Sequence, residues 1–322
     1  MVSMTLLGLD DIRVAANRID GQHVRTPLLP CAWISDQLWL KPENLQPIGA
    51  FKIRGAMNAV GALSPDVRGR GLITHSSGNH GRAVAWAARK YGVEAVIVMP
   101  DTTPGVKING VRKLGAEVVL VPTGQREARV NAIIADRGLV LVSPFDHPDV
   151  IAGQGTAGLE IAEDAPDVDT VLVPVSGGGL VSGIAVAIKA LRPNARVVAV
   201  EPELAADLAE GFRLGRRVSW DADRTGRTVA DALRIPVVGD LTWEHISQLV
   251  DDVVTVTEPD ILAAMARLAT DARLVAEPGG AVAVAAALSV PGAIRGHTVA
   301  VVSGGNVDPA LLAGLLEREA AN

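Results

Sequence analysis

Short apolar runs alternate with amphipathic stretches along most of the chain. In its first half, the apolar runs lie at residues 72–77, 95–100, 117–122 and 139–144. The stretches between these runs repeat apolar residues at helical spacing, at residues 82–90, 106–115 and 126–138. Strand-like runs separated by helical stretches predict consecutive βαβ units on a parallel sheet.

A second series of the same kind begins near residue 168. Its strand-like runs lie within residues 170–176, 196–203, 250–269 and 297–306. A helical stretch covers residues 179–191, whereas residues 213–240 are rich in arginine, glycine and aspartate and are the least regular part. Two such series predict an α/β protein with two parallel-sheet lobes and helices on both faces of each sheet.

The composition narrows the class of protein. The chain has 322 residues, of which 48% are hydrophobic and 20% are charged, as in ordinary globular proteins. A net charge of -6 with scattered basic residues argues against a nucleic-acid partner. The longest strongly apolar stretch, residues 281–290, is about half as long as a membrane-spanning helix requires, so we expect no membrane insertion.

We also expect a cytoplasmic location. Residues 1–11 lack the basic start and the long apolar core of a secretion signal. The single cysteine, Cys31, cannot form an internal disulfide, which fits a reducing compartment.

Three loops rich in glycine and hydroxyl groups each follow a predicted strand. They are SSGNHG at residues 76–81, SGGGL at residues 176–180 and SGGN at residues 303–306. In open parallel sheets, ligands bind beyond the carboxyl ends of the strands, and a cleft between two lobes is lined by both. We therefore expect the three loops to converge on one cleft.

The triple-glycine loop at residues 176–180 precedes a helical stretch. Consecutive glycines let backbone amides approach an anion closely, and a helix N-terminus adds partial positive charge. A phosphate group fits this description, and so does a tight turn that needs glycine only for its backbone angles. The loop also imitates part of a dinucleotide-binding fingerprint, but Ser182 stands where that fingerprint has its third glycine.

Lys52, one of six lysines in the chain, follows an aromatic residue in the segment AFKIRGA, residues 50–56. A lysine that is partly shielded from water has a lowered pKa, and its free amine can attack a carbonyl to form a Schiff base. A solvated lysine at the start of an amphipathic helix has the same local sequence.

The polar residues of the other two loops each have two interpretations. Asn79 or Ser77 can cap the helix that we expect to begin near residue 82. Alternatively, these side chains can line a site for a cofactor oxygen and a substrate carboxylate. Ser303 is either a turn serine or a donor to a ring nitrogen.

The sequence carries few signs of metal or acyl-transfer chemistry. Its six histidines lack the spacing of zinc ligands, and no GxSxG motif is present. Oxygen ligands gather at Glu201, Ala205 and Asp207, whose two carboxylates and one carbonyl suit a hard divalent cation. A helix N-terminus that carries acidic residues explains the same spacing.

Six motifs occur in one order along nearly the whole chain. They are AFKIRGA at 50–56, SSGNHG at 76–81, VIAGQGT at 150–156, PVSGGGL at 174–180, AEPGGAV at 276–282 and VSGGN at 302–306. In this combination the chain resembles the serine/threonine dehydratase and serine racemase family of pyridoxal phosphate enzymes, which have the tryptophan synthase β-type fold, also called fold type II.

The resemblance implies a role for each matched position. Lys52 is expected to bind pyridoxal phosphate covalently, with Phe51 beside it, and to act as the catalytic base. The other implied cofactor contacts are Asn79 to the ring hydroxyl, Ser303 to the pyridine nitrogen, and the amides of Gly177, Gly178, Gly179 and Leu180 to the phosphate. The implied contacts to the substrate carboxylate are Ser76, Ser77, Asn79 and His80. Ser77 also matches the catalytic position on the opposite face of the substrate in the racemases.

The resemblance further implies a divalent cation, Mg²⁺, Ca²⁺ or Mn²⁺, bound by Glu201, Ala205 and Asp207, and a homodimer. It implies a large cofactor-binding lobe formed by residues 1–68 and 147–322. A small lobe at residues 69–146 is expected to close over the substrate.

Two positions depart from the family pattern. Ala50 stands where relatives often have serine or threonine, which removes a hydroxyl contact at that point. Ser176 stands where many relatives have a fourth glycine, but its backbone amide is still present.

The implied activity is elimination of the β-hydroxyl from a small 3-hydroxy amino acid such as L-threonine or L-serine, with release of a 2-oxo acid and ammonia. Within the family, serine racemase and 3-hydroxyaspartate dehydratase are alternatives, since the motifs do not fix the side chains that select the substrate. Arg126 can pair with a second substrate carboxylate or be a solvated helix residue. Outside the family, the alternatives are an NAD-dependent dehydrogenase and a non-catalytic amino-acid sensor.

Overall fold

The computed structural model describes residues 6–76, 78–103 and 105–320. Its strands are β1 (Leu29–Pro30), β2 (Leu38–Pro42), β3 (Leu72–His75), β4 (Ala95–Pro100), β5 (Glu117–Val121), β6 (Val140–Leu141), β7 (Thr170–Pro174), β8 (Arg196–Pro202), β9 (Asp252–Val256) and β10 (Thr298–Val302).

The longer helices are α1 (Leu9–Ile19), α2 (Lys52–Ala62), α4 (Asn79–Tyr91), α5 (Gly105–Arg112), α6 (Arg126–Arg137), α7 (Pro148–Asp164), α8 (Gly179–Leu191), α9 (Asp207–Leu214), α11 (Asp240–Leu249), α12 (Glu258–Thr270), α13 (Pro278–Ser289) and α14 (Pro309–Ala320). Short helical segments are α3 (Pro65–Arg68), α10 (Ala222–Thr225) and the 3-10 turns η1 (Glu43–Leu45), η2 (Glu203–Ala205) and η3 (Asp231–Leu233).

The strands form two sheets. The larger sheet has the order β1-β2-β10-β7-β8-β9, and the smaller sheet has the order β5-β4-β3-β6. Every neighbouring pair is parallel except β1 and β2. The predicted α/β fold with two parallel-sheet lobes is therefore confirmed.

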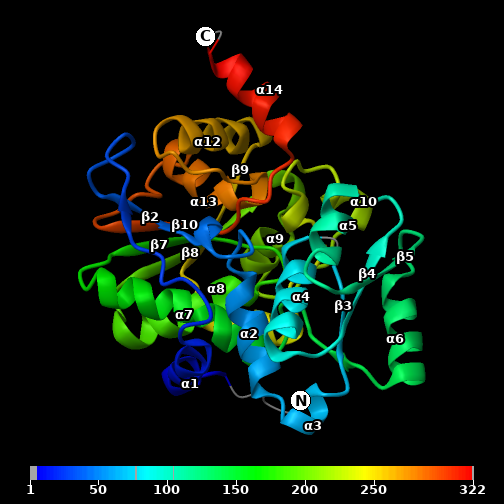
Figure 1. Cartoon of the computed structure of the whole chain (residues 1–322). Coiled ribbons are helices and arrows are strands. Elements are labelled where there is room, and N and C mark those ends of the chain that lie inside the picture. Colours follow the sequence, from blue (N-terminus) through cyan, green and yellow to red (C-terminus); the bar gives the residue numbers. More distant parts are fainter. Residues whose placement is uncertain (1–5, 77, 104, 321–322) are drawn as a thin grey trace.

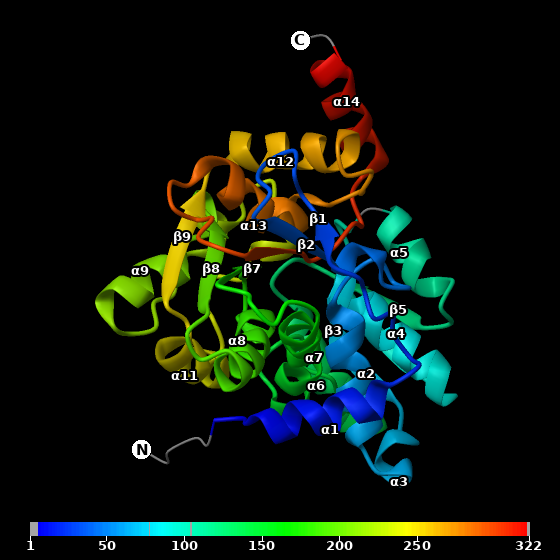
Figure 2. The same ribbon diagram turned by 90° about the vertical axis from the view of Figure 1, so that its left-hand side faces the viewer.

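Helices cover both faces of the larger sheet. Helices α12 and α13 pack on one face, with apolar side chains from β2, β8 and β10, and helices α7, α8 and α11 pack on the other (Figure 2). Helix α13 is apolar all round, as the sequence PGGAVAVAAALS requires for a helix buried on every side.

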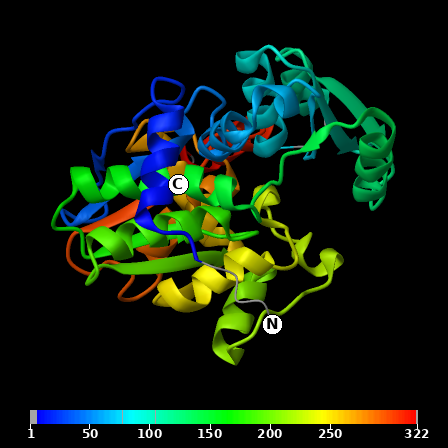
Figure 3. The ribbon, with the colours of Figure 1, turned by 90° about the horizontal axis from the view of Figure 1, so that it is seen from below.

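The smaller sheet lies to one side of the larger one, as the cyan to blue-green part of Figure 3 shows. Helix α4 packs on one of its faces, and α6 packs on the other. Helix α2 contacts both α4 and α7, so that it lies at the seam between the two sheets (Figure 1). Lys52 is the first residue of this seam helix.

The sequence patterns do not predict strand β2. Its sequence, LWLKP, has a lysine inside a short apolar run, which resembles a surface segment. In the structure, however, Lys41 is fully buried. A buried ammonium group requires a charged partner, and Glu160 on α7 supplies it, with 2.6 Å between Lys41 Nζ and Glu160 Oε2.

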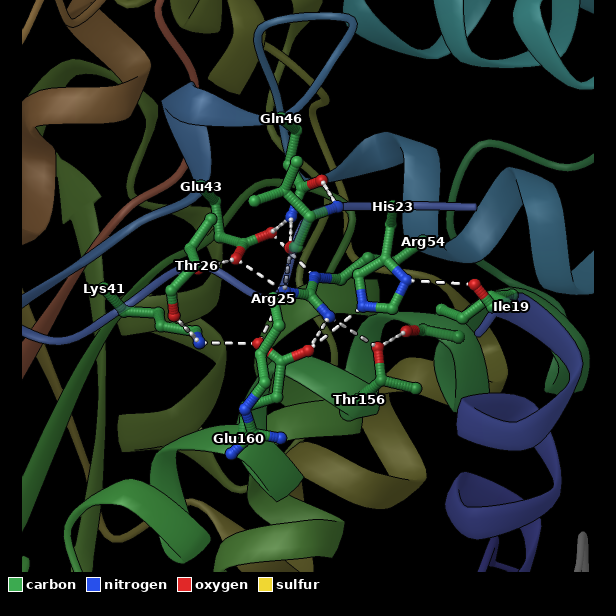
Figure 4. Close-up of polar contacts among 12 residues, drawn as sticks. Ile19, His23, Arg25, Thr26, Lys41, Glu43, Gln46, Arg54, Thr156 and Glu160 are labelled. Carbon is green, nitrogen blue, oxygen red and sulfur yellow. Dashed lines mark hydrogen bonds and ion pairs between the residues drawn. The ribbon is translucent and has the colours of Figure 1, made fainter. Parts of the chain in front are cut away.

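Glu160 belongs to a buried cluster of charges that also contains Lys41, Glu43 and Arg54, shown in Figure 4. The guanidinium of Arg54 donates to Glu43 at 2.7 and 2.8 Å and to Glu160 at 2.6 and 2.8 Å. Burial alone would raise the pKa of Glu43, but the charge of Arg54 outweighs this effect and the pKa lies below its usual value. The cluster therefore stays ionised and ties α2 to η1 and α7.

Polar contacts also join elements that flank the two sheets. Lys107 on α5 forms an ion pair with Asp231 on η3, and both side chains are partly exposed. In a second contact of this kind, Arg82 on α4 donates to Asn306 in the loop after β10. In the described part of the chain, none of the helices combines the length and the apolar character that crossing a membrane requires.

The buried cluster leads to a test of stability. Glu43→Gln leaves the fully buried Arg54 with one carboxylate instead of two. Breaking a buried ion pair costs about 3–5 kcal/mol, so we expect a loss of this order in the free energy of unfolding measured by urea titration. The matched control, Glu163→Gln, removes an exposed partner of Arg25 and should cost less than about 1 kcal/mol. Equal losses in the two variants would contradict the role of the cluster.

Candidate active site

Lys52 lies at the N-terminus of α2, and its amine points at the segment that returns from the smaller sheet to the larger one. Lys52 Nζ donates to the carbonyl of Pro144 at 2.6 Å, and it lies 5.1 Å from the ring centroid of Phe51. Burial lowers the pKa of Lys52 to about 8. A fraction of the amine is therefore neutral near physiological pH, and this fraction is far larger than for an ordinary lysine with a pKa of about 10.4.

The next residue of this segment reaches the triple-glycine loop. A Cβ atom at Gly177 would lie 2.3 Å from the ring of Phe145, so only glycine allows this contact. Asp146, which follows, accepts from the amides of Asp240 and Thr242 at the start of α11. Pro144 and Phe145 thus bring the amine of Lys52 and the triple-glycine loop to the same place.

The triple-glycine loop forms the N-terminus of α8. Gly178 is the N-cap with φ +92°, a backbone conformation that glycine adopts without strain. The carbonyl of Gly177 accepts from Thr242 Oγ1 at 2.8 Å, which fixes the loop. Within the described residues, the amides of Gly177 and Gly178 have no hydrogen-bond acceptor. Free amides at the positive end of a helix suit a phosphate group.

The loop after β10 runs beside the start of α2. The amide of Phe51 donates to the carbonyl of Ser303 at 3.0 Å, and Ala50 forms an isolated bridge with Gly304. Ser303 is buried, and its hydroxyl is 3.4 Å from the carbonyl of Gly279 on α13. This is a long hydrogen bond, so the hydroxyl remains open to a better partner.

Helix α4 begins at Asn79, three residues earlier than expected, and its N-cap is Gly78 without a side-chain cap. Asn79 therefore does not cap the helix. Its Nδ2 atom donates to Glu277 Oε1 at 2.5 Å, and its Oδ1 atom accepts from Asn306 Nδ2 at 2.7 Å. Burial raises the pKa of the Glu277 carboxyl to about 7.

The remaining residues of the SSGNHG loop differ in what they offer a ligand. Ser76 follows β3 and is partly exposed, and its Oγ atom accepts from the amide of Gly78 at 3.2 Å. His80 Nε2 is 3.0 Å from the carbonyl of Val142, so this nitrogen carries the proton. Burial and the charge of Lys52 lower the pKa of His80 to about 3, which keeps the ring neutral. Ser77 lies outside the described residues.

The predicted cation ligands lie together at the end of β8. Glu201 is the last residue but one of β8, and it accepts from the amides of Leu208 at 3.3 Å and Ala209 at 2.8 Å, so it caps α9. Asp207 is the first residue of α9, and its buried Oδ2 atom has no partner among the described residues. Ala205 is buried beside them.

Among the residues that the structure describes, no basic side chain forms an ion pair with either of these two carboxylates. Burial and the neighbouring Asp207 raise the pKa of Glu201 well above its usual value, and burial raises that of Asp207 to about 7. Two buried carboxylates with an unpaired oxygen suit a divalent cation, which would relieve their repulsion. Within the described residues, no group of three or more histidine, cysteine, aspartate or glutamate side chains lies close enough to hold a metal ion, so a cation at this site would draw on a backbone carbonyl as well.

Sequence reasoning missed three residues of this site. Pro144 and Phe145 contribute through a carbonyl and a packed ring, neither of which leaves a motif. Glu277 stands inside the AEPGGAV motif, but only the fold brings it to Asn79. The place of this glutamate within the motif is the one signal that the sequence offers.

Comparison with known proteins agrees with this geometry. Residues 19–305 match the family described as pyridoxal-phosphate dependent enzyme. The L-threonine ammonia-lyase of Thermotoga maritima is 43% identical over 310 residues, 94% of this chain and 76% of that protein. The L-threo-3-hydroxyaspartate ammonia-lyase of Saccharomyces cerevisiae is 39% identical over 92% of this chain and 93% of that protein.

Solved structures give the same result. The structure of maize serine racemase superposes with a TM-score of 0.90 at 37% identity, and the match covers 98% of this chain and 99% of that chain. The family match spans most of the chain and includes the lysine, the triple-glycine loop and the strands that carry them. This chain is therefore a member of the pyridoxal-phosphate dependent enzyme family.

Proposed function

We propose that this chain eliminates the β-hydroxyl and the amino group of a small 3-hydroxy amino acid, such as L-threonine or L-serine, and releases a 2-oxo acid and ammonia. The observation that carries the proposal is the partly buried amine of Lys52, which donates to the carbonyl of Pro144 beside the segment that packs on the triple-glycine loop. Similarity to ammonia-lyases that act on hydroxy amino acids supports the same reaction.

When bound, pyridoxal phosphate supplies an electron sink conjugated to the substrate Cα. Lys52 would hold its aldehyde carbon, with Phe51 beside the ring. Asn79 would contact the ring hydroxyl, and Ser303 the pyridine nitrogen. The amides that would hold the phosphate belong to Gly177, Gly178, Gly179 and Leu180.

Once the substrate amine has displaced it, Lys52 would be free to remove the proton at Cα as a general base. A lowered pKa of about 8 keeps part of this amine unprotonated at neutral pH. Ser303 offers a hydroxyl where a carboxylate would stabilise a protonated ring nitrogen more strongly. The weaker partner favours prompt loss of the β-hydroxyl.

We propose that the substrate carboxylate binds at the start of α4, near Ser76, Ser77 and Asn79. His80 has committed its ring proton to Val142, so its contribution would come from its backbone amide in the first turn of the helix. Unpaired amides at a helix N-terminus attract a carboxylate.

Racemisation of serine is a second candidate, favoured by the close superposition on maize serine racemase. Ser77 would then return a proton to Cα on the face opposite Lys52. Assaying D-serine formation from L-serine beside oxo-acid release separates the two reactions. Hydroxyaspartate remains a further candidate substrate, with Arg126 as the partner of its second carboxylate.

We further propose a divalent cation, Mg²⁺, Ca²⁺ or Mn²⁺, at Glu201, Asp207 and the carbonyl of Ala205. It would neutralise the two carboxylates and fix the turn between β8 and α9. We also propose that residues 69–146 close over the substrate against the remainder, that the protein is a homodimer and that it is cytoplasmic. The buried Cys31 fits the last proposal.

Replacing Lys52 tests the reaction. Lys52→Ala should lower kcat/KM for oxo-acid release from L-threonine or L-serine by about 10²- to 10⁴-fold or more, because the base is lost. The visible absorbance of bound cofactor should disappear as well. Lys113→Ala, which changes an exposed lysine, is the matched control and should behave as wild type. Full turnover by Lys52→Ala would disprove the assignment.

The pKa of Lys52 predicts how cofactor capture depends on pH. Below about pH 8 the amine is mostly protonated, and above it mostly neutral. We therefore expect the rate at which the apoprotein takes up pyridoxal phosphate, followed by visible absorbance, to rise toward pH 8 and then level off. A rate that still climbs toward about pH 10.4, the pKa of an ordinary lysine, would contradict the burial of this amine.

The cation site predicts a change in thermal stability. Adding Mg²⁺ or Mn²⁺ at 100 times its Kd should stabilise the wild type by about 2.7 kcal/mol, which thermal melting against an EDTA sample measures. Asp207→Asn should lose most of this gain, whereas Glu203→Gln, which alters an exposed acid on the same turn, should keep it. An equal gain in Asp207→Asn would place the cation elsewhere.

A further inference from the structure

Four polar side chains form a continuous chain of hydrogen bonds at the seam between the two sheets. Arg82 Nη1 donates to Asn306 Oδ1. Asn306 Nδ2 donates to Asn79 Oδ1 at 2.7 Å, and Asn79 Nδ2 donates to Glu277 Oε1 at 2.5 Å. We call these four residues the seam relay.

The two ends of the seam relay fix its direction. Arginine has only donors, and an ionised carboxylate has only acceptors, whereas each amide side chain has both. Asn306 must therefore turn its oxygen toward Arg82 and its nitrogen toward Asn79, and Asn79 must turn its nitrogen toward Glu277. The second N–H of Asn306 donates to the carbonyl of Ile48 at 2.9 Å, which gives the same orientation independently.

Close packing leaves the middle of the relay little freedom. A Cβ atom at Gly304 would lie 2.3 Å from Glu277 Oε1 and 3.1 Å from Asn79 Nδ2. The backbone of the loop after β10 therefore lies against the Asn79–Glu277 hydrogen bond, and it is the same loop that carries Ser303. Rotation of the Asn79 amide would break one hydrogen bond at each of its two atoms.

We propose that Arg82, Asn306 and Glu277 are positioning residues that hold the Asn79 amide so that its remaining N–H faces the oxygen of the cofactor ring. This inference rests on the proposed function, since it takes Asn79 as the contact to that oxygen. A donor held at the oxygen favours its ionised form, because a hydrogen bond to the charged state stabilises that state.

Glu277 is the acceptor at the end of the relay, and its surroundings determine its protonation state. Glu277 is buried, and its pKa is about 7, raised mainly by burial and further by Asp231, and lowered by Asn79, Lys107 and Arg82. An ionised Glu277 accepts more strongly than a neutral one. The hold on Asn79 should therefore tighten as pH rises through 7.

Arg82 is the best position for a test, because it lies at the end of the relay farthest from Glu277. With Asn306 and Trp86 it lines a cavity of about 260 Å³ next to residues 47–49, and its guanidinium lies against the backbone of Gly110. The unbranched side chain of methionine retains part of this packing. Arg82→Met removes the donor that orients Asn306. Arg82→Lys keeps a donor, and Arg89→Met alters an exposed arginine on the same helix as a control.

The experiment measures cofactor affinity and the pH titration of the visible absorbance of bound pyridoxal phosphate. Loss of one oriented hydrogen bond corresponds to a twofold to tenfold change in an equilibrium, so Arg82→Met should weaken affinity by about this factor. Its absorbance should also shift toward the form with a protonated ring oxygen. Arg82→Lys should restore part of both effects, and Arg89→Met should match the wild type.

Variants at the other end make the result decisive. Glu277→Gln keeps an oxygen acceptor for Asn79 and should resemble the wild type more closely than Glu277→Ala, which removes it. If Arg82→Met and Glu277→Ala both leave affinity and absorbance unchanged in a protein that binds the cofactor, the inference fails while the proposed function stands. If the wild type takes up no pyridoxal phosphate, both fail.

Discussion

The arrangement of this protein depends on one buried charge, the guanidinium of Arg54. Arg54 lies in α2, two residues after Lys52. It pairs with Glu43 of η1, the turn that follows β2, and with Glu160 of α7. An uncompensated charge at this depth would be prohibitive, so α2 can adopt only an orientation that keeps both carboxylates in contact. The same constraint accounts for the buried Lys41, because Glu160 serves both cations.

With α2 fixed in this way, the chemistry of the site arises where segments from both sheets meet. The amine at its first residue is removed from water by the segment returning from the smaller sheet, and that segment also packs on the glycine loop of the larger one. Neither sheet alone provides a shielded amine beside unpaired amides. The reactivity of Lys52 is thus a property of the seam and not of its local sequence.

The sequence patterns anticipate the parts of this protein that are local. Alternating apolar runs predict the parallel strands, and the triple-glycine loop marks the start of the helix that begins at Gly179. Lys41 could not be assigned to a buried strand, because its partner Glu160 is 119 residues away. Glu277 and Phe145 cannot be assigned from the sequence for the same reason, since each acts only through a neighbour that tertiary packing supplies.

The ion pair between Lys107 and Asp231 has a different character from the buried cluster, since water reaches both of its side chains. Attraction between such groups falls as dissolved salt shortens the Debye length, to about 8 Å at physiological ionic strength. The strength of the contact between α5 and η3 therefore depends in part on the ionic strength of the solution. Potassium chloride should therefore weaken the Lys107–Asp231 ion pair and leave the buried ion pairs of Arg54 nearly unchanged. The ionic strength can thus change how firmly α5 is attached to η3 without changing the residues of the active site.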